Sequence, residues 1–253
     1  MAEETSRREF SKRALQSLLT FSLLDTLFVH DVFGEEVKAL AAKWVADLNQ
    51  LVGDVKDEKI KQIEWQKKVE ELLAKVDLPD LLRLVDFDKL TQKIKYKEKG
   101  ERSLRFQFKE IEGIPTKLVF GKQIFALKKG RSVAPHGHNN MATAFFILKG
   151  KLHGRHFQRL EDEREHLIIR PTIDEKFGPG KFSTISDYKD NIHWFTAESE
   201  RAFIFNFHVL GIGQKTSGKK TGRIYLDPQG EKLKGGRIRA RRLTYKEAYK
   251  LYG

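Results

Sequence analysis

The sequence predicts a mainly β protein, a β-barrel of the jelly-roll kind preceded by an α-helical segment. Apolar residues recur at helical spacing over residues 42–95, with charged residues between them, which is typical of helices that pack one face on a core. From Ser103 onward the pattern changes to short β-forming runs separated by glycine and proline turns. Many short strands with tight turns indicate a barrel or double sheet. We therefore expect a helical segment at 42–100 and the barrel at 101–228.

The helical segment is expected to form a hairpin packed against the barrel. Gly53-Asp54 separates two helices, Asp77-Leu78-Pro79 ends the second, and Asp80 begins a further turn or two. The expected strands are residues 104–108, 117–120, 123–127, 144–148, 151–159, 167–169, 183–185, 202–209 and 224–226, with one more strand carrying the histidines discussed below.

The C-terminal region is expected to be a basic tail, residues 229–253, that contains a short helix. Thr244 is its expected N-cap, with Glu247 at capping-box spacing. The whole chain carries a formal net charge of +13, and residues 214–253 hold 12 Lys/Arg against 3 Asp/Glu. We favour a solvated basic surface, then contact of the tail with an anionic membrane or cell-wall polymer. No nucleic-acid partner is expected, because no nucleic-acid motif is present.

The N-terminus predicts export from the cytoplasm. Residues 6–12 read Ser-Arg-Arg-Glu-Phe-Ser-Lys, which resembles the twin-arginine signal, and the apolar stretch 15–33 follows. Ala39-Leu40-Ala41 supplies a small-x-small cleavage pattern, so residues 1–41 are expected to be a signal peptide and the mature protein to be periplasmic. The alternative is an amphipathic N-terminal helix on a cytoplasmic protein.

The chain has no cysteine, which excludes disulfides and thiolate ligands and suits an oxidising compartment.

A histidine pair is the strongest functional signal in the chain. His136 and His138 stand one residue apart in a β-forming stretch, and residues i and i+2 of a strand point to the same face. Two imidazoles on one face can bind one metal ion. His193 lies in a second β-forming stretch and is the expected third ligand.

These segments resemble the motifs of a known family. The stretch from Gly130 to Gly150 is similar to the first cupin motif at every fixed position except one, where Thr143 stands in place of a glutamate. The second cupin motif is degenerate apart from His193. The run Asn191-Ile-His-Trp-Phe-Thr-Ala197 resembles instead the thiol dioxygenase branch of the cupins, the cysteamine dioxygenase and plant cysteine oxidase type. His136-x-His138-x-x-Met141 and Gly222-Arg-x-Tyr225 are also similar to that branch, and the resemblance covers about residues 115 to 225.

The resemblance implies a site and a reaction. His136, His138 and His193 would bind Fe(II), with Mn, Ni or Zn as alternatives, and the enzyme would oxidise a small thiol with O₂. The alternatives are another metal-dependent cupin enzyme, such as an isomerase or lyase, or a non-catalytic module that binds a sugar or another small molecule.

Further residues are expected around the ligands. His153 and His156 would point to opposite faces of one strand, so at most one of them faces inward. His153 is the expected spare ligand or ligand partner. Expected pocket walls are Met141, Phe145 and Trp194, beside Thr143. The remaining histidines, His30, His166 and His208, are expected to have no role in the site.

Overall fold

The computed structural model describes residues 35–212 and 220–253. The chain divides into two units, 1–38 and 39–253, and the described residues fall almost entirely in the second. The twin-arginine motif, the apolar stretch after it and His30 lie outside the described residues, so export remains an expectation. Ala39 to Ala41, the expected cleavage pattern, belongs to the helix Glu35–Lys56.

In the part of the chain that the structure describes, four helices precede the barrel. They are α2 (Glu35–Lys56), α3 (Gln62–Leu73), α4 (Leu78–Leu84) and α5 (Phe87–Thr91). Helix α4 begins at Leu78, two residues before the expected Asp80, because the side chain of Asp77 accepts a hydrogen bond from the Asp80 backbone N–H at 3.0 Å and caps the helix. Within the described part of the chain, none of the helices has the length and apolar character needed to cross a membrane.

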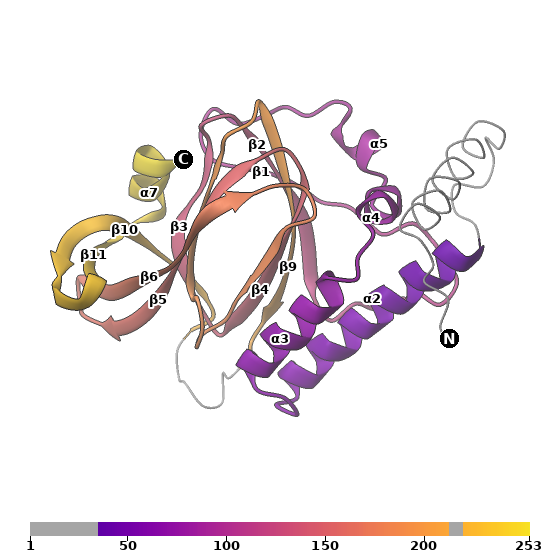
Figure 1. Ribbon diagram of the computed structural model, residues 1–253, viewed down its shortest axis with the longest axis horizontal. Helices are drawn as coiled ribbons and strands as arrows, with labels where there is room; N and C mark the ends of the chain where they lie inside the picture. Colours follow the sequence, from indigo (N-terminus) through magenta and orange to yellow (C-terminus); the bar gives the residue numbers. More distant parts are fainter. Residues whose placement is uncertain (1–34, 213–219) are drawn as a thin grey trace, which may run out of the picture. The chain divides into compact units, whose positions relative to one another are not determined.

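Two β-sheets form the body of the molecule (Figure 1). The strands of the first sheet, in spatial order, are β1 (Arg102–Leu104), β2 (Gly121–Lys128), β9 (Arg201–Leu210), β4 (Met141–Lys149) and β7 (Phe182–Ile185). Those of the second are β10 (Gly222–Leu233), β11 (Arg237–Leu243), β6 (His166–Phe177), β5 (Leu152–Asp162), β8 (Ile192–Ala197) and β3 (Ser132–Asn139). Pairing of β3 with β10 closes the second sheet into a barrel. The predicted fold class, mainly β with a barrel preceded by helices, is confirmed.

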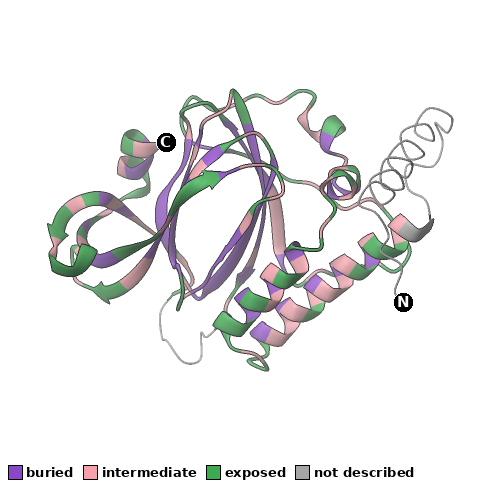
Figure 2. Cartoon of the chain, in the orientation of Figure 1, coloured by how far each residue is buried: buried purple, intermediate pink, exposed green. Residues whose placement is uncertain are grey.

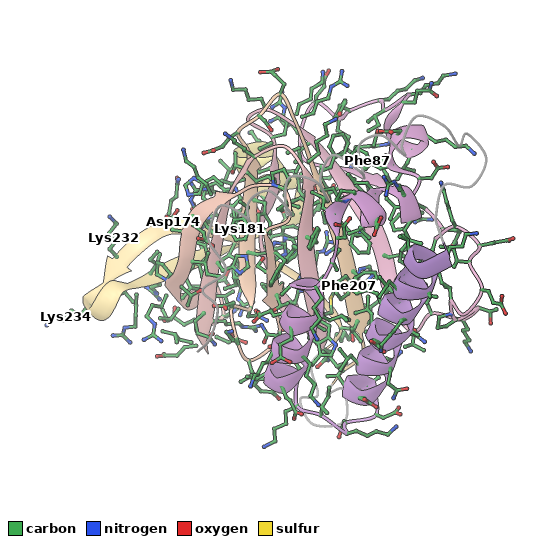
Figure 3. The ribbon with its side chains drawn as sticks, turned by 45° about the vertical axis from the view of Figure 1, so that its right-hand side comes forward. Phe87, Asp174, Lys181, Phe207, Lys232 and Lys234 are labelled. Carbon is green, nitrogen blue, oxygen red and sulfur yellow. The ribbon has the colours of Figure 1, made fainter. Side chains whose placement is uncertain are left out.

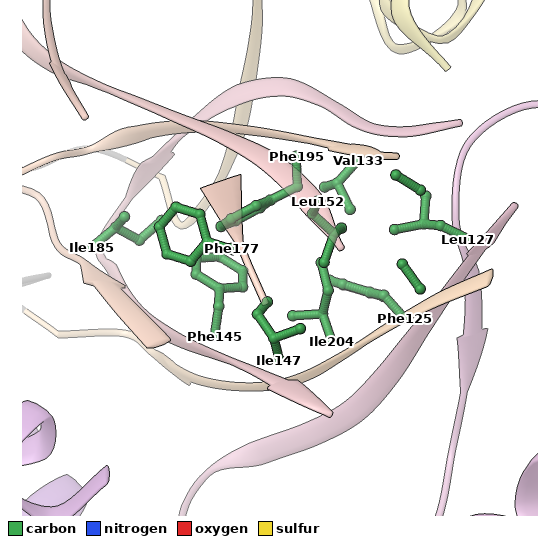
Figure 4. Close-up of a cluster of buried hydrophobic side chains, with 12 residues drawn as sticks. Phe125, Leu127, Val133, Phe145, Ile147, Leu152, Phe177, Ile185, Phe195 and Ile204 are labelled. Carbon is green, nitrogen blue, oxygen red and sulfur yellow. The ribbon is translucent and has the colours of Figure 1, made fainter. Parts of the chain in front are cut away.

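The main core lies between the two sheets. Its side chains come from β2, β4, β7 and β9 on one side and from β3, β5, β6 and β8 on the other, and they are almost completely buried (Figures 2 and 4). Phe145, Phe177 and Phe195 form its aromatic part, with ring centroids of Phe145 and Phe195 5.0 Å apart. This dense packing fixes the spacing of the strands that carry the histidines.

The helices cover the outer face of the first sheet. Alternate residues of β9 point outward and meet helical aromatic rings: Phe203 packs on Phe87, with centroids 5.0 Å apart, and Phe207 on Trp65 at 6.5 Å. Figure 3 labels Phe207 on this face, beside the helices. A sheet covered on both faces explains why β9 reads as a nearly continuous apolar run.

Two predicted strands are wrong. The sequence pattern predicts strands at 104–108 and 117–120, but β1 ends at Leu104 and the chain then continues without strand pairing to β2. Phe106 and Phe108 instead pack on the ring of Phe205, with centroids 5.8 and 6.5 Å away. Their spacing reflects contact with a common aromatic neighbour rather than a β-ladder.

The expected C-terminal tail is part of the barrel. Strands β10 and β11 form a hairpin, β11 pairs with β6, and inward-facing Leu226 and Ala240 join a second small core with Phe157 and Ile192. The sequence does not reveal these strands readily, because outward-facing arginines alternate with the inward-facing apolar residues. Several of the arginines are neutralised locally; Arg239 donates to Glu163 at 2.8 Å.

The predicted short helix at the C-terminus is present as α7 (Tyr245–Tyr252). Its start is the expected capping box, in which the Thr244 hydroxyl accepts from the Glu247 backbone N–H and the Glu247 carboxylate accepts from the Thr244 backbone N–H.

Candidate metal centre

Strand pairing places four ring-bearing side chains in one row on the inner face of the second sheet. His193 on β8 is paired with His156 on β5 on one side and with His136 on β3 on the other, and His136 is paired with Tyr225 on β10. Paired residues of antiparallel strands project to the same face. His138, two residues along β3, lies on that face in the next row.

Three of these histidines converge on one point. His136, His138 and His193 each offer a ring nitrogen, and these nitrogens lie within 4.8 Å of one another. The Nε2 atoms of His136 and His193 are 3.1 Å apart. Two imidazole nitrogens about 2.1 Å from one metal ion would be separated by about 3.0 Å at a right angle and about 3.4 Å at a tetrahedral angle. The donor set therefore fits a divalent metal ion after small side-chain rotations.

The contacts of Nδ1 in His136 and His138 leave the Nε2 atom of each ring for a metal. His136 Nδ1 donates to the carbonyl oxygen of Ala134 at 2.8 Å, so its Nε2 carries the lone pair. His138 Nδ1 is 3.2 Å from the hydroxyl of Thr143, and its Nε2 is buried without a partner among the described residues. A buried ring nitrogen without a partner costs free energy unless a ligand satisfies it, which supports a metal at this point.

The three imidazoles are neutral at physiological pH. Burial, followed by the charge of Arg223, lowers the pKa of His136 from 6.5 to about 3. Burial and the neighbouring histidines hold the pKa of His138 and of His193 well below 6.5. Only the neutral imidazole binds a metal, so the barrel holds all three ligands in the binding form.

The backbone around the ligands is clamped by a buried amide side chain. Asn191 Nδ2 donates to the carbonyl oxygen of His138 at 2.9 Å, and Asn191 Oδ1 accepts from the His138 N–H at 3.3 Å. A glycine stands at 137 because a Cβ there would lie 2.8 Å from Asn191 Oδ1. Gly137 thus lets β3 approach Asn191, and Asn191 holds the start of β8 against β3.

A small cavity adjoins the three histidines. Its volume is about 30 Å³. Besides the ligands it is lined by Phe125, Met141, Thr143, Phe145, Asn206, His208 and Arg223, without an acidic side chain among the described residues. Arg223 is paired with His138 across β10 and β3 and is solvent-exposed. The cavity therefore presents a positive environment with room for only a few atoms.

The structure separates the expected neighbours of the site into two groups. Met141, Thr143 and Phe145 line the cavity, and the ring of Phe145 lies 4.6 Å from that of His193. Trp194 instead points outward, beneath the guanidinium of Arg155, whose Cζ is 4.2 Å from the ring centroid. Trp194 is thus not a pocket wall.

The choice of His153 over His156 is corrected. His153 lies on the outer face of β5, where its ring contacts Asp174 and Arg155. His156 is completely buried, with its ring 6.5 Å from that of His193 and its Nε2 3.3 Å from the Ser183 hydroxyl. Leu152 and Gly154 share the inward face of His156, so the buried Leu152 was the sequence signal that could have set the parity.

His208, which the sequence did not place near the site, lines the cavity. It projects into the cavity from β9, where it is paired with Thr143. The outward row Phe203, Phe205 and Phe207 implies that His208 faces inward, but a strand that is apolar on both faces does not reveal its parity in sequence.

Comparisons with solved structures give neighbours of low sequence identity. No family model matches the sequence, and no curated protein matches it. Among solved structures, an uncharacterised protein with a double-stranded β-helix domain from Klebsiella pneumoniae matches with a TM-score of 0.36 and 8% identity, over 54% of this chain and 87% of that chain. A cupin superfamily protein from Desulfitobacterium hafniense gives 0.31 and 14%, over 46% and 84%.

Procruciferin, an 11S globulin from Brassica napus, gives a TM-score of 0.32 and 12% identity over 44% of this chain, which spans only 23% of the globulin. These neighbours are barrel proteins of the cupin or double-stranded β-helix kind or seed globulins, and at such scores they carry no argument about function. The chain's own strand pairing and side chains define it as a mainly β barrel protein with a candidate three-histidine metal centre.

Proposed function

We propose that the protein is a non-haem Fe(II) dioxygenase of the cupin type that oxidises a small thiol with O₂. The observation that carries the proposal is a buried set of three neutral imidazoles, His136, His138 and His193, whose nitrogens converge beside a cavity that no carboxylate of the described residues lines. The sequence resemblance to three-histidine thiol dioxygenases points to the same reaction.

The charge of the site favours a substrate that brings its own anion. Three imidazoles compensate none of the charge of a divalent ion, and Arg223 adds a further positive charge at the cavity. A thiolate sulfur is an anionic ligand that would balance this charge. Bound iron would supply O₂ activation, and the thiol RSH and O₂ combine to the sulfinic acid RSO₂H with both oxygen atoms in the product and no external reductant.

The side chains of this chain would orient the reactants and exclude water. Phe145 and Met141 form apolar walls on the inner side of the cavity, both at least nine-tenths buried. A volume of about 30 Å³ holds only a few atoms beside the three ring nitrogens, so only the sulfur end of a thiol and O₂ would enter it.

The test is iron-dependent O₂ consumption. The metal-free protein is loaded anaerobically with Fe(II), and O₂ uptake is followed with cysteamine, 2-mercaptoethanol and an N-terminal cysteine peptide. We expect uptake of one O₂ per thiol consumed and a sulfinate product by mass spectrometry, with neither in the His193→Ala variant. An iron-loaded protein whose O₂ uptake with every thiol equals that of His193→Ala would overturn the proposal.

A further inference from the structure

The turn before β8 links the metal centre to helix α3. The turn comprises residues 186–191, between β7 and the ligand His193. Asn191 reaches from its end to the backbone of His138, and the same Asn191 Nδ2 donates to the carbonyl oxygen of Ser186 at 2.9 Å. One side chain therefore connects the first residue of the turn, the last residue of the turn and a ligand strand.

Helix α3 holds the other side of this turn. The Ser186 hydroxyl donates to Gln66 Oε1 at 2.6 Å, and Gln66 Nε2 donates to the Thr184 hydroxyl at 3.2 Å. Ser186 and Gln66 are completely buried. Polar groups buried in this way are costly to leave unpaired, so the helix and the turn are strongly fixed to one another.

A second contact runs from the same helix to the end of β3. Gln62 Nε2 donates to Asp187 Oδ2 at 3.1 Å, and Gln62 Oε1 accepts from the Asp187 backbone N–H at 2.9 Å. Asp187 Oδ2 also accepts from the backbone N–H of Asn140, two residues beyond His138, at 3.1 Å. Gln62 and Gln66 lie on successive turns of α3. Through Asp187 and Ser186 they hold the turn 186–191, and Asp187 also holds the residue that follows β3.

We infer that Asn191, Ser186 and Gln66 are positioning residues that couple the docking of helix α3 to metal binding by His138 and His193. The inference rests on the metal centre of the proposed function but not on its oxidation chemistry. Binding a metal requires the ring nitrogens, now up to 4.8 Å apart, to hold a closer spacing. The chain of hydrogen bonds from Gln66 through Ser186 to Asn191, here called the relay, restricts the backbone movement of both ligand strands. The fold therefore already meets part of the entropy cost of ordering the ligands before the metal binds.

Coupling of this kind is reciprocal. If the docked helix favours the metal, the bound metal must favour the docked helix by the same factor. Metal loading should therefore slow amide hydrogen exchange in residues 62–73 and 186–191. Helix α7, which packs on β3, β10 and β11 and takes no part in the relay, serves as the internal reference.

The test combines two variants with a matched control. Asn191→Ala removes the clamp. Ser186→Ala removes the hydroxyl that donates to Gln66 Oε1 and accepts from the backbone N–H groups of Tyr188 and Lys189. Asn49→Ala is the control, because Asn49 also clamps a backbone: it accepts from Val119 N–H at 2.8 Å and donates to the carbonyl oxygen of Lys117 at 3.5 Å.

Chelator competition with Zn(II) then gives the metal dissociation constant of each variant. We expect Asn191→Ala and Ser186→Ala to weaken binding about 10- to 100-fold, the range usual for hydrogen-bond partners of metal ligands. Asn49→Ala should lower the melting temperature without changing the dissociation constant. Unchanged metal affinity in Asn191→Ala and Ser186→Ala would reduce the relay to a structural role and overturn the inference.

Exchange in the metal-free protein separates this inference from the proposed function. Asn191→Ala should speed exchange of the His138 amide and of helix α3 together, whether or not the wild type binds metal. Absence of metal binding in the wild type would refute the proposed function. Fast exchange at His138 with unchanged exchange in α3 would refute the coupling itself.

Discussion

Acidification should destabilise the metal-free protein steeply. Four histidines, His136, His138, His156 and His193, are completely or almost completely buried, and burial lowers the pKa of each; His136 reaches about 3 and His156 about 4. The unfolded chain binds protons at these groups near pH 6.5, whereas the folded chain does not. Stability is therefore fully present above pH 6.5 and is lost as the pH falls from there toward the folded pKa values.

The size of the loss depends on the unfolded pKa alone while the pH stays well above the folded values. Between pH 7 and pH 5.5, each buried neutral histidine removes about 1.3 kcal/mol of unfolding free energy. The four together remove about 5 kcal/mol, which is comparable to the whole stability of many domains. A bound metal holds the imidazoles unprotonated and adds its own binding free energy, so the loaded protein should lose less.

The assay is chemical denaturation at pH 7.0, 6.2 and 5.5, in the presence of a chelator and again with one equivalent of Zn(II). His156→Gln should flatten the slope of the metal-free protein by about one quarter, because it removes one of the four buried neutral imidazoles. A metal-free protein whose unfolding free energy is the same at pH 7.0 and 5.5 would refute the burial of neutral imidazoles.

Three substitutions test individual contacts of the site. Thr143→Val keeps the shape of the side chain but removes the hydroxyl 3.2 Å from His138 Nδ1, so Zn(II) affinity by chelator competition should fall about tenfold; wild-type affinity would show that this contact does not orient the ring. Gly137→Ala places a methyl group 2.8 Å from Asn191 Oδ1, so both affinity and melting temperature should fall, and a fully stable variant would contradict the close approach. His153→Ala should leave metal content unchanged, since this ring lies on the outer face; metal loss there would reverse the assignment made for β5.

The histidine cluster was accessible to sequence reasoning because its geometry is local. An i, i+2 spacing places His136 and His138 on one face of any strand, and the structure brings His193 beside them through the β3–β8 register. The register itself is a product of non-local pairing, so sequence alone could propose the third ligand only through the resemblance. The relay from Gln66 to Asn191 could not be predicted from sequence either, because its two ends are more than a hundred residues apart in the chain.

The failures of prediction have physical causes. His153 was preferred to His156 because parity after a turn depends on which residue first enters the core, and that residue is the buried Leu152. The C-terminal hairpin was taken for a basic tail because its outward arginines alternate with the apolar residues that face the small barrel. In both cases the buried face of a strand determined the direction of its side chains, and the polar residues of the exposed face made the buried face hard to recognise in sequence.

Metal stoichiometry tests the central claim most directly. Protein expressed in metal-supplemented medium, and the same protein stripped and reloaded with Fe(II), Mn(II) or Zn(II), is measured by plasma emission spectroscopy beside the His136→Ala, His138→Ala and His193→Ala variants. The account predicts one metal ion per chain in the wild type and none in any of the three variants, because removing one of three neutral ligands leaves too few donors for tight binding. A wild type that binds no divalent metal, or a His193→Ala variant that keeps a full equivalent, would contradict it.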